Sequence, residues 1–174
     1  MQITARRARF FRIASAAWLL ALLPVGPAAS VGVGDAAPGF SLPTASGKAL
    51  ALDTLRGQVV YVDFWASWCG PCRRSFPWMN EMQDRYKDRG LTVVAINVDK
   101  KRDDADRFLQ ANIARFAVVY DPDGKTPLAY DVAGMPSSYL IDRAGKVVAV
   151  EPGFLDERKA AREDAIRSLV AAPR

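Results

Sequence analysis

Residues 58–66 form a nearly continuous run of β-branched and aromatic side chains, and two cysteines follow it closely. Such a run predicts a central strand buried on both faces, because a half-buried strand would alternate apolar with polar residues. Over residues 71–89 the apolar side chains recur three or four positions apart, which is typical of an amphipathic helix. Cys69 and Cys72 therefore lie where a buried strand passes into a helix.

The remainder of the chain continues this alternation of strands and helices. We expect further strands at residues 91–98, 116–120, 138–142 and 146–151. We expect helices from Asp103, as the capping residue, to residue 112, and from residue 156 to 171. The turn Arg143-Ala144-Gly145 is short enough to join its two strands as an antiparallel pair. Together these elements predict an α/β sandwich with a mixed central sheet.

A short hairpin is expected before the first buried strand. Residues 40–42 and 49–52 flank the turn signal Ser46-Gly47. A small, glycine-rich stretch from residue 31 to 37 precedes this hairpin. We therefore interpret residues 31–174 as one domain that begins with an N-terminal β-hairpin extension.

The first thirty residues have the pattern of a secretory signal peptide. Four arginines with no acid among them precede an apolar run over residues 13–25, and small residues end at Ser30. A membrane-spanning helix needs roughly 20 apolar residues, so a cleavable signal is favoured over a permanent anchor. The expected location is periplasmic or otherwise extracytoplasmic, with a membrane-tethered protein as the alternative. The Arg6-Arg7 pair matches a twin-arginine signal only loosely.

Charge and composition argue against several classes of function. The chain has 24 basic and 19 acidic residues, and the four arginines of the signal account for most of the excess. No basic stripe with interleaved aromatic residues is present, so we expect no nucleic-acid surface. Histidine is absent and two cysteines cannot supply the four ligands of a structural zinc site, so we expect neither a metal nor a cofactor.

The cysteine pair is the feature that carries chemistry. At a helix N-terminus, free backbone N–H groups and the helix dipole stabilise a thiolate, so Cys69 is the expected attacking sulfur. Cys72, one turn further on, is the expected resolving sulfur. Gly70 keeps the approach to Cys69 open, and Pro71 suits the first helical turn. A permanent structural disulfide is the alternative, but so short a loop removes little entropy from the unfolded chain.

The segment from Val62 to Cys72, VDFWASWCGPC, resembles the active-site segment of thioredoxins. The residues Asn97-Val98-Asp99 and the segment Gly134–Asp142 resemble the secreted TlpA/ResA-like branch of that superfamily. The similarity covers residues 36–170 approximately. It implies the thioredoxin fold, a three-layer α/β/α sandwich, and the activity of a thiol:disulfide oxidoreductase.

The resemblance also implies roles for residues outside the cysteine pair. Pro136 would be a cis-proline facing the cysteines, and the backbone of Met135 would pair with the substrate chain; an ordinary trans proline in a loop is the alternative. Trp68 is the tryptophan that we expect to be exposed beside the sulfurs, whereas Trp65 could equally pack in the core. Gly153 matches a glycine near the substrate groove, or is a plain turn glycine.

Asp63 interrupts the apolar strand six residues before Cys69. If it is buried, desolvation raises its pKa and lets it exchange a proton with Cys72, as the matching acid does in thioredoxins. The alternative is an aspartate at a strand end that reaches water. Ala95 stands where many thioredoxins place a lysine close to this acid, which would leave Asp63 without the familiar cation.

We expect a monomeric reductase of protein disulfides, with cysteines of apocytochrome c or of copper sites as clients. In an oxidising compartment it would need a membrane electron donor of the DsbD/CcdA kind. A disulfide oxidase or isomerase is the first alternative. A Cu(I)-binding chaperone is less well supported, because no His or Met lies near the pair. A peroxiredoxin-like peroxidase shares Pro38-Gly39-Phe40, but Trp-Cys-Gly-Pro-Cys is not a peroxidatic motif.

Overall fold

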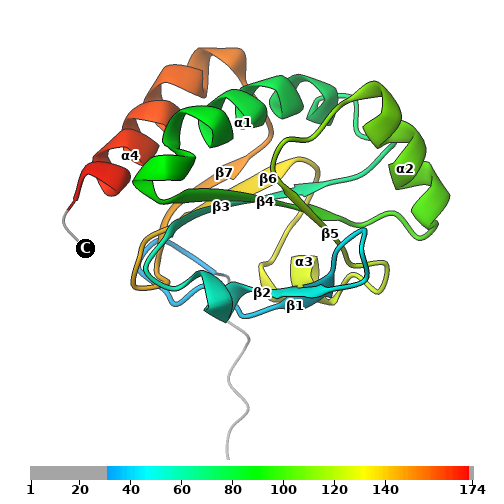
Figure 1. The fold of residues 1–174 in the computed structure, drawn as a ribbon, viewed down its shortest axis with the longest axis horizontal. Coiled ribbons are helices and arrows are strands. Elements are labelled where there is room, and N and C mark those ends of the chain that lie inside the picture. The colour runs from blue at the N-terminus through cyan, green and yellow to red at the C-terminus, as the bar shows by residue number, and fades with distance from the viewer. Residues whose placement is uncertain (1–30, 173–174) are drawn as a thin grey trace, which may run out of the picture.

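The computed structural model describes residues 31–172 and is built around a five-stranded mixed sheet (Figure 1). The strand order is β5-β4-β3-β6-β7. The bounds are β3 (Val59–Trp65), β4 (Leu91–Asn97), β5 (Ala117–Tyr120), β6 (Ser137–Ile141) and β7 (Val147–Pro152). β3, β4 and β5 are parallel, whereas β6 runs antiparallel to β3 and β7. The expected mixed sheet and its final antiparallel pair are confirmed.

Three helices cover one face of the sheet, and a hairpin with two short helices covers the other (Figure 1). The first face carries α1 (Cys72–Tyr86), α2 (Arg102–Ala111) and α4 (Lys159–Ala171). The second carries the hairpin of β1 (Ser41–Pro43) and β2 (Ala49–Ala51), the 3-10 helix η1 (Leu52–Leu55) and the short α3 (Lys125–Ala129). The hairpin extension is confirmed.

β3 is buried along its whole length, as its sequence predicts. Successive side chains of a strand point to opposite faces, so β3 contributes to two separate cores. Tyr61 and Trp65 belong to the cluster under α1, α2 and α4, whereas Val62 and Phe64 belong to the cluster under the hairpin and α3. Asp63 lies between Tyr61 and Trp65 in the sequence and therefore points toward the helical face.

The structure differs from the sequence-based expectations at three helices. Asp103 is not a capping residue: α2 begins one position earlier, its N-cap is Lys101, and no side chain caps it. Asp103 instead lies in the first turn, where its charge favours the positive end of the helix dipole. The short α3 was not expected. The last helix begins as a 3-10 turn, η3 (Asp156–Arg158), before α4.

Arg143 joins several chain segments at the end of the sheet where β3 begins. Its Nη1 donates to the carbonyl of Gly57 at 2.8 Å, just before β3. Its Nη2 lies 3.4 Å from the carbonyl of Arg89, at the end of the 3-10 helix η2 (Lys87–Arg89), and 3.3 Å from that of Val170 in α4. One guanidinium therefore links the turn between β6 and β7 to three other segments.

The expected export signal, residues 1–30, lies outside the described residues. Within residues 31–172, no helix is long and apolar enough to span a membrane.

Candidate active site

Cys69 and Cys72 form a disulfide at the junction between β3 and α1. Cys72 is fully buried and Cys69 is 3% exposed, whereas the neighbouring Trp68 is 70% exposed. Both cysteines are therefore covered, whereas the side chain just before them in the sequence is open to solvent. Trp65 is fully buried, so the core-packing role applies to it, and the exposed tryptophan is the one the sequence indicates.

The N-terminus of α1 supplies polar contacts to the first sulfur. The backbone N–H of Cys72 points at Sγ of Cys69, with a distance of 3.2 Å between nitrogen and sulfur. Pro71 occupies the N-cap position with φ −62°, and both Gly70 and Pro71 are exposed beside the disulfide. In the reduced state this N–H and the dipole of a helix extending to Tyr86 would favour the thiolate of Cys69 over the thiol.

Asp99 fixes the loop that carries the cysteines. Its carboxylate accepts hydrogen bonds from the backbone N–H of Ser67 at 2.8 Å and from the Ser67 hydroxyl at 2.9 Å. The side-chain amide of Asn97 donates to the same carboxylate at 2.8 Å. Sequence reasoning used Asn97 and Asp99 only as marks of resemblance. An aspartate two residues after the end of a buried strand was the available signal for this supporting role.

The Met135–Pro136 peptide bond is cis and lies at the same end of the sheet as the disulfide. Phe64 pairs with Ser137 across β3 and β6, so Pro136 immediately before β6 lies beside the end of β3. The backbone N–H of Gly153 donates to the carbonyl of Pro136 at 2.8 Å. Gly153 has φ +74°, which glycine adopts without strain, so it forms a turn and also holds the proline loop.

Asp63 is a buried acid: it is 2% exposed, and its Oδ2 has no hydrogen-bond partner among residues 31–172. The alternative of an aspartate that reaches water is therefore wrong. Desolvation by burial raises its pKa well above the ordinary value, and the charge of Arg162 partly offsets that rise. Ala95 is the partner of Asp63 on β4, so the strand alignment behind the missing lysine is correct.

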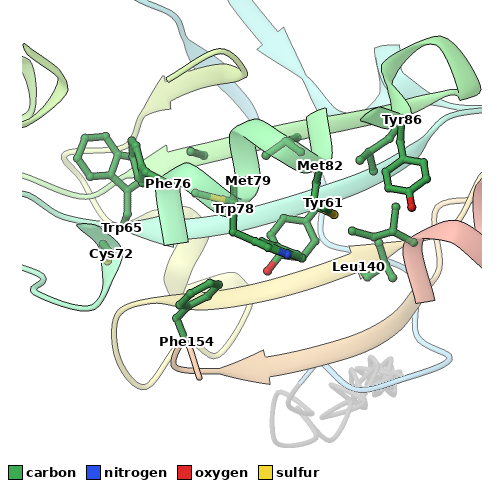
Figure 2. Close-up of a cluster of buried hydrophobic side chains, with 14 of the residues drawn as sticks. Tyr61, Trp65, Cys72, Phe76, Trp78, Met79, Met82, Tyr86, Leu140 and Phe154 are labelled. Atoms are coloured by element: carbon green, nitrogen blue, oxygen red, sulfur yellow. The ribbon is translucent and has the colours of Figure 1, made fainter. Parts of the chain in front are cut away.

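Aromatic and sulfur-containing side chains pack around the buried end of the site (Figure 2). The rings of Trp65 and Phe76 meet edge to face with centroids 5.0 Å apart, and Phe108 of α2 lies 4.8 Å from Trp65. On the other side of α1, Trp78 lies 5.5 Å from Tyr61 and 5.9 Å from Phe154. This packing keeps Cys72 dry and fixes α1 on the sheet.

The structure brings Trp68, Gly70, Pro71 and the cysteines together on one loop, with the cis-proline at the same sheet end. Sequence reasoning missed Arg162 on α4, whose charge acts on Asp63, and Glu151 on β7, which contacts Arg162. Nothing in their local sequence distinguishes them from solvated charges. In the described part of the chain, no group of three or more Cys, Asp or Glu side chains is arranged to hold a metal ion.

Comparison with known proteins gives consistent results. Residues 32–166 match the redoxin family. The thiol-disulfide oxidoreductase ResA of Bacillus subtilis is 37% identical over 128 residues, which cover 74% of this chain and 72% of that protein.

Solved structures agree. A crystal structure of a candidate thiol:disulfide interchange protein DsbE from Chlorobium tepidum is 51% identical, with a TM-score of 0.79, and covers 82% of this chain and 100% of that chain. The thioredoxin domain of a thiol-disulfide oxidoreductase from Bacteroides vulgatus is 26% identical, with a TM-score of 0.71, and covers 79% of this chain and 99% of that chain. With this fold and this cysteine pair, the chain belongs to the redoxin family.

Proposed function

We propose that this protein is an extracytoplasmic thiol-disulfide oxidoreductase that reduces disulfides in other proteins. The observation that carries the proposal is the Cys69–Cys72 pair at the N-terminus of α1, at the sheet end that also holds the cis Met135–Pro136 bond. The relatives named ResA and the DsbE-like structure support the same chemistry.

The first step needs the reduced pair. The thiolate of Cys69 attacks one sulfur of the substrate disulfide, which forms a Cys69–substrate bond and releases the other substrate sulfur as a thiolate. That thiolate takes a proton from solvent. The exposed surface of Trp68, Gly70 and Pro71 would receive the substrate chain, and the backbone of Met135 would pair with it.

The second step needs Cys72 to lose its proton. Asp63 in its carboxylate form accepts that proton, directly or through water, and the new Cys72 thiolate attacks Sγ of Cys69. The Cys69–Cys72 disulfide forms, the substrate leaves with both sulfurs reduced, and two electrons have moved from this protein to the substrate. Burial raises the pKa of Asp63, which makes its carboxylate a stronger base toward the Cys72 thiol.

The proposal also assigns the direction of electron flow, from this protein to its substrate. The Gly-Pro dipeptide between the cysteines and the resemblance to secreted TlpA/ResA-like proteins favour a reductase whose clients include apocytochrome c or copper-site cysteines. The N-terminal thirty residues favour export. In an oxidising compartment the disulfide described here would then be reduced again by a membrane donor of the DsbD/CcdA kind.

The test is the reduction potential of the pair. The purified protein is equilibrated in glutathione redox buffers at neutral pH, and the reduced fraction is read after trapping the thiols. A potential near about −250 mV supports the reductase, and one near about −120 mV would make the protein a disulfide-donating oxidase.

A variant tests the order of the two sulfurs. Cys72→Ser should accumulate a mixed disulfide between Cys69 and a substrate protein, because the resolving sulfur is missing. Cys69→Ser is the matched control and should trap nothing. Trapping through Cys72 in the second variant would contradict the assigned roles.

A further inference from the structure

Four residues lie in one lateral row across the sheet. Asp63 of β3 pairs with Ala95 of β4 on one side and with Ser138 of β6 on the other, and Ser138 pairs with Glu151 of β7. Directly paired residues point to the same face of a sheet, so the acid, the serine and the glutamate all face the helical layer. β4 contributes only a methyl group to this row.

A buried arginine reaches this row from the helical layer. The Arg162 side chain of α4 is 3% exposed, and its Nε contacts Oε2 of Glu151. Its Nη2 donates to the carbonyl of Gly153 at 3.0 Å, and Nη1 has no hydrogen-bond partner in the described part of the chain. Burying a guanidinium without a full set of hydrogen-bond partners costs free energy, so we expect Arg162 to have a role besides packing.

The charge of Arg162 acts on Asp63. Burial raises the pKa of this acid, and the positive charge of Arg162 opposes that rise. Other titratable groups on this face of the sheet include Tyr61 on β3 and Glu151 on β7, with the cysteine pair at the start of α1. Burial raises the pKa of Tyr61 above its ordinary value and keeps it neutral. Among residues 31–172, Arg162 is the cation whose charge lowers the pKa of Asp63.

A small cavity completes the arrangement. Its volume is about 70 Å³, and the polar side chains of Tyr61, Ser138, Glu151 and Arg162 share its lining with Leu140 and three alanines. A space of this size is large enough for one water, and these four side chains can supply the two to four polar partners that a buried water needs. Ser138, the direct partner of Asp63 on β6, is the lining residue that places this cavity beside the acid.

We propose that Arg162, held by Glu151 and the Gly153 carbonyl, is the positioning residue that sets the protonation of Asp63 during the second thiol step. It supplies from α4 the counter-charge that β4 lacks at Ala95. Because Gly153 also donates to the carbonyl of Pro136, the same guanidinium connects the buried acid to the cis-proline loop. The consequence for catalysis rests on the proposed function.

The test is the titration of Asp63 in the reduced protein, followed by the carbon-13 signal of its carboxyl group, with Asp63→Asn identifying the signal. Arg162→Gln removes the positive charge, so the midpoint should move up by about one pH unit. Glu151→Gln removes a negative charge beside Arg162, so the midpoint should move down by a smaller amount. Arg162→Lys keeps the charge and should restore most of the native midpoint.

Arg167→Gln is the matched control, since Arg167 lies on the same helix with its side chain 58% exposed. It should leave the midpoint unchanged. In each variant the pH profile of mixed-disulfide resolution should move with the midpoint of Asp63, and in the Asp63→Asn background the Arg162 substitution should no longer move it.

Opposite shifts separate an electrostatic role from a structural one. If Arg162 only held α4 in place, both substitutions would admit water and both midpoints would fall. A fall in Arg162→Gln, or no shift in a folded variant, would therefore overturn the proposal. If Arg162→Gln does not fold, the double variant with Glu151→Gln decides: its midpoint must lie above that of Glu151→Gln alone. The titration needs no partner protein, so it remains decisive even if the proposed reductase activity fails.

Discussion

The two faces of β3 differ in whether their buried polar atoms have hydrogen-bond partners. On the face under the hairpin and α3, Phe64 packs against Tyr130 and Tyr139. Both tyrosine hydroxyls donate hydrogen bonds, from Tyr130 to the Pro38 carbonyl at 2.8 Å and from Tyr139 to the Tyr130 carbonyl at 2.6 Å. On the helical face, Oδ2 of Asp63 and Nε1 of Trp65 are buried without hydrogen-bond partners among residues 31–172.

Within this single strand, one face therefore serves stability and the other serves the chemistry of the site. A buried polar atom without a partner costs about 1–3 kcal/mol, so a face selected only for stability would not keep two of them. The hairpin face satisfies its hydroxyls and fills its core with rings. The helical face keeps an acid that is hard to ionise, on the side of the sheet that α1 and the cysteines cover.

The largest effect should come from the hairpin face. Phe64→Ala removes a fully buried ring and leaves a cavity, so the free energy of unfolding should fall by about 3–5 kcal/mol. Denaturant unfolding measures it. The pH profile of thiol reactivity should keep its shape, and a shifted profile would show that the two faces are not separable.

Asp63→Asn should instead raise the free energy of unfolding. Because the folded-state pKa of Asp63 is raised, the native state binds more protons than the unfolded state between the ordinary value of 3.8 and the folded value. Native stability therefore falls as pH rises through that range and stays lowered above it.

The asparagine variant should thus be more stable than the native protein by about 1–3 kcal/mol at pH 8, with the gain vanishing below pH 4. Thermal unfolding at both pH values measures this, and mixed-disulfide resolution should slow in the same variant. A loss of stability at pH 8 would contradict the assignment of Asp63 as a functional acid whose burial costs stability.

A smaller effect is expected from Tyr130→Phe, which removes one satisfied hydroxyl from the hairpin face. The free energy of unfolding should fall by about 1 kcal/mol, since the Pro38 carbonyl loses its donor. Tyr139→Phe is a matched comparison. An increase in stability in either variant would remove the contrast between the faces.

Trp68→Ala should change stability least, by less than about 0.5 kcal/mol, because this side chain is 70% exposed. Its expected effect is on the rate of reaction with a protein disulfide, with little change toward a small disulfide reagent. Equal rates for both substrates would argue against a role for Trp68 in binding the substrate chain.

Local patterns in the sequence were sufficient for most of the fold. The apolar run of β3, the helical spacing after Cys72 and the short turn before β7 each specify their element through neighbouring residues. The short helix α3 could not be found by this kind of reasoning. Residues 125–129 make a helix too short to show a period, and its start depends on Asp121, which accepts hydrogen bonds from the N–H groups of Gly124 and Thr126.

Some residues of the candidate site could likewise be identified from the sequence, and others could not. Cys69, Cys72 and Asp63 could be identified because a motif or a break in the apolar pattern marks them. Arg162 and Glu151 could not, since their place relative to Asp63 depends on the register of three strands and on how α4 packs against them. Those are long-range properties that no local pattern reports.

The three carbonyls held by Arg143 have a consequence for how the molecule opens. Segments that share one hydrogen-bond donor are released together when that donor moves, so the start of β3, the end of η2 and the end of α4 form one cooperative unit. Amide hydrogens there should exchange by a common opening event. The sheet end that carries the cysteines lies at the opposite pole, where exchange of disulfide partners can proceed without loosening this anchored end.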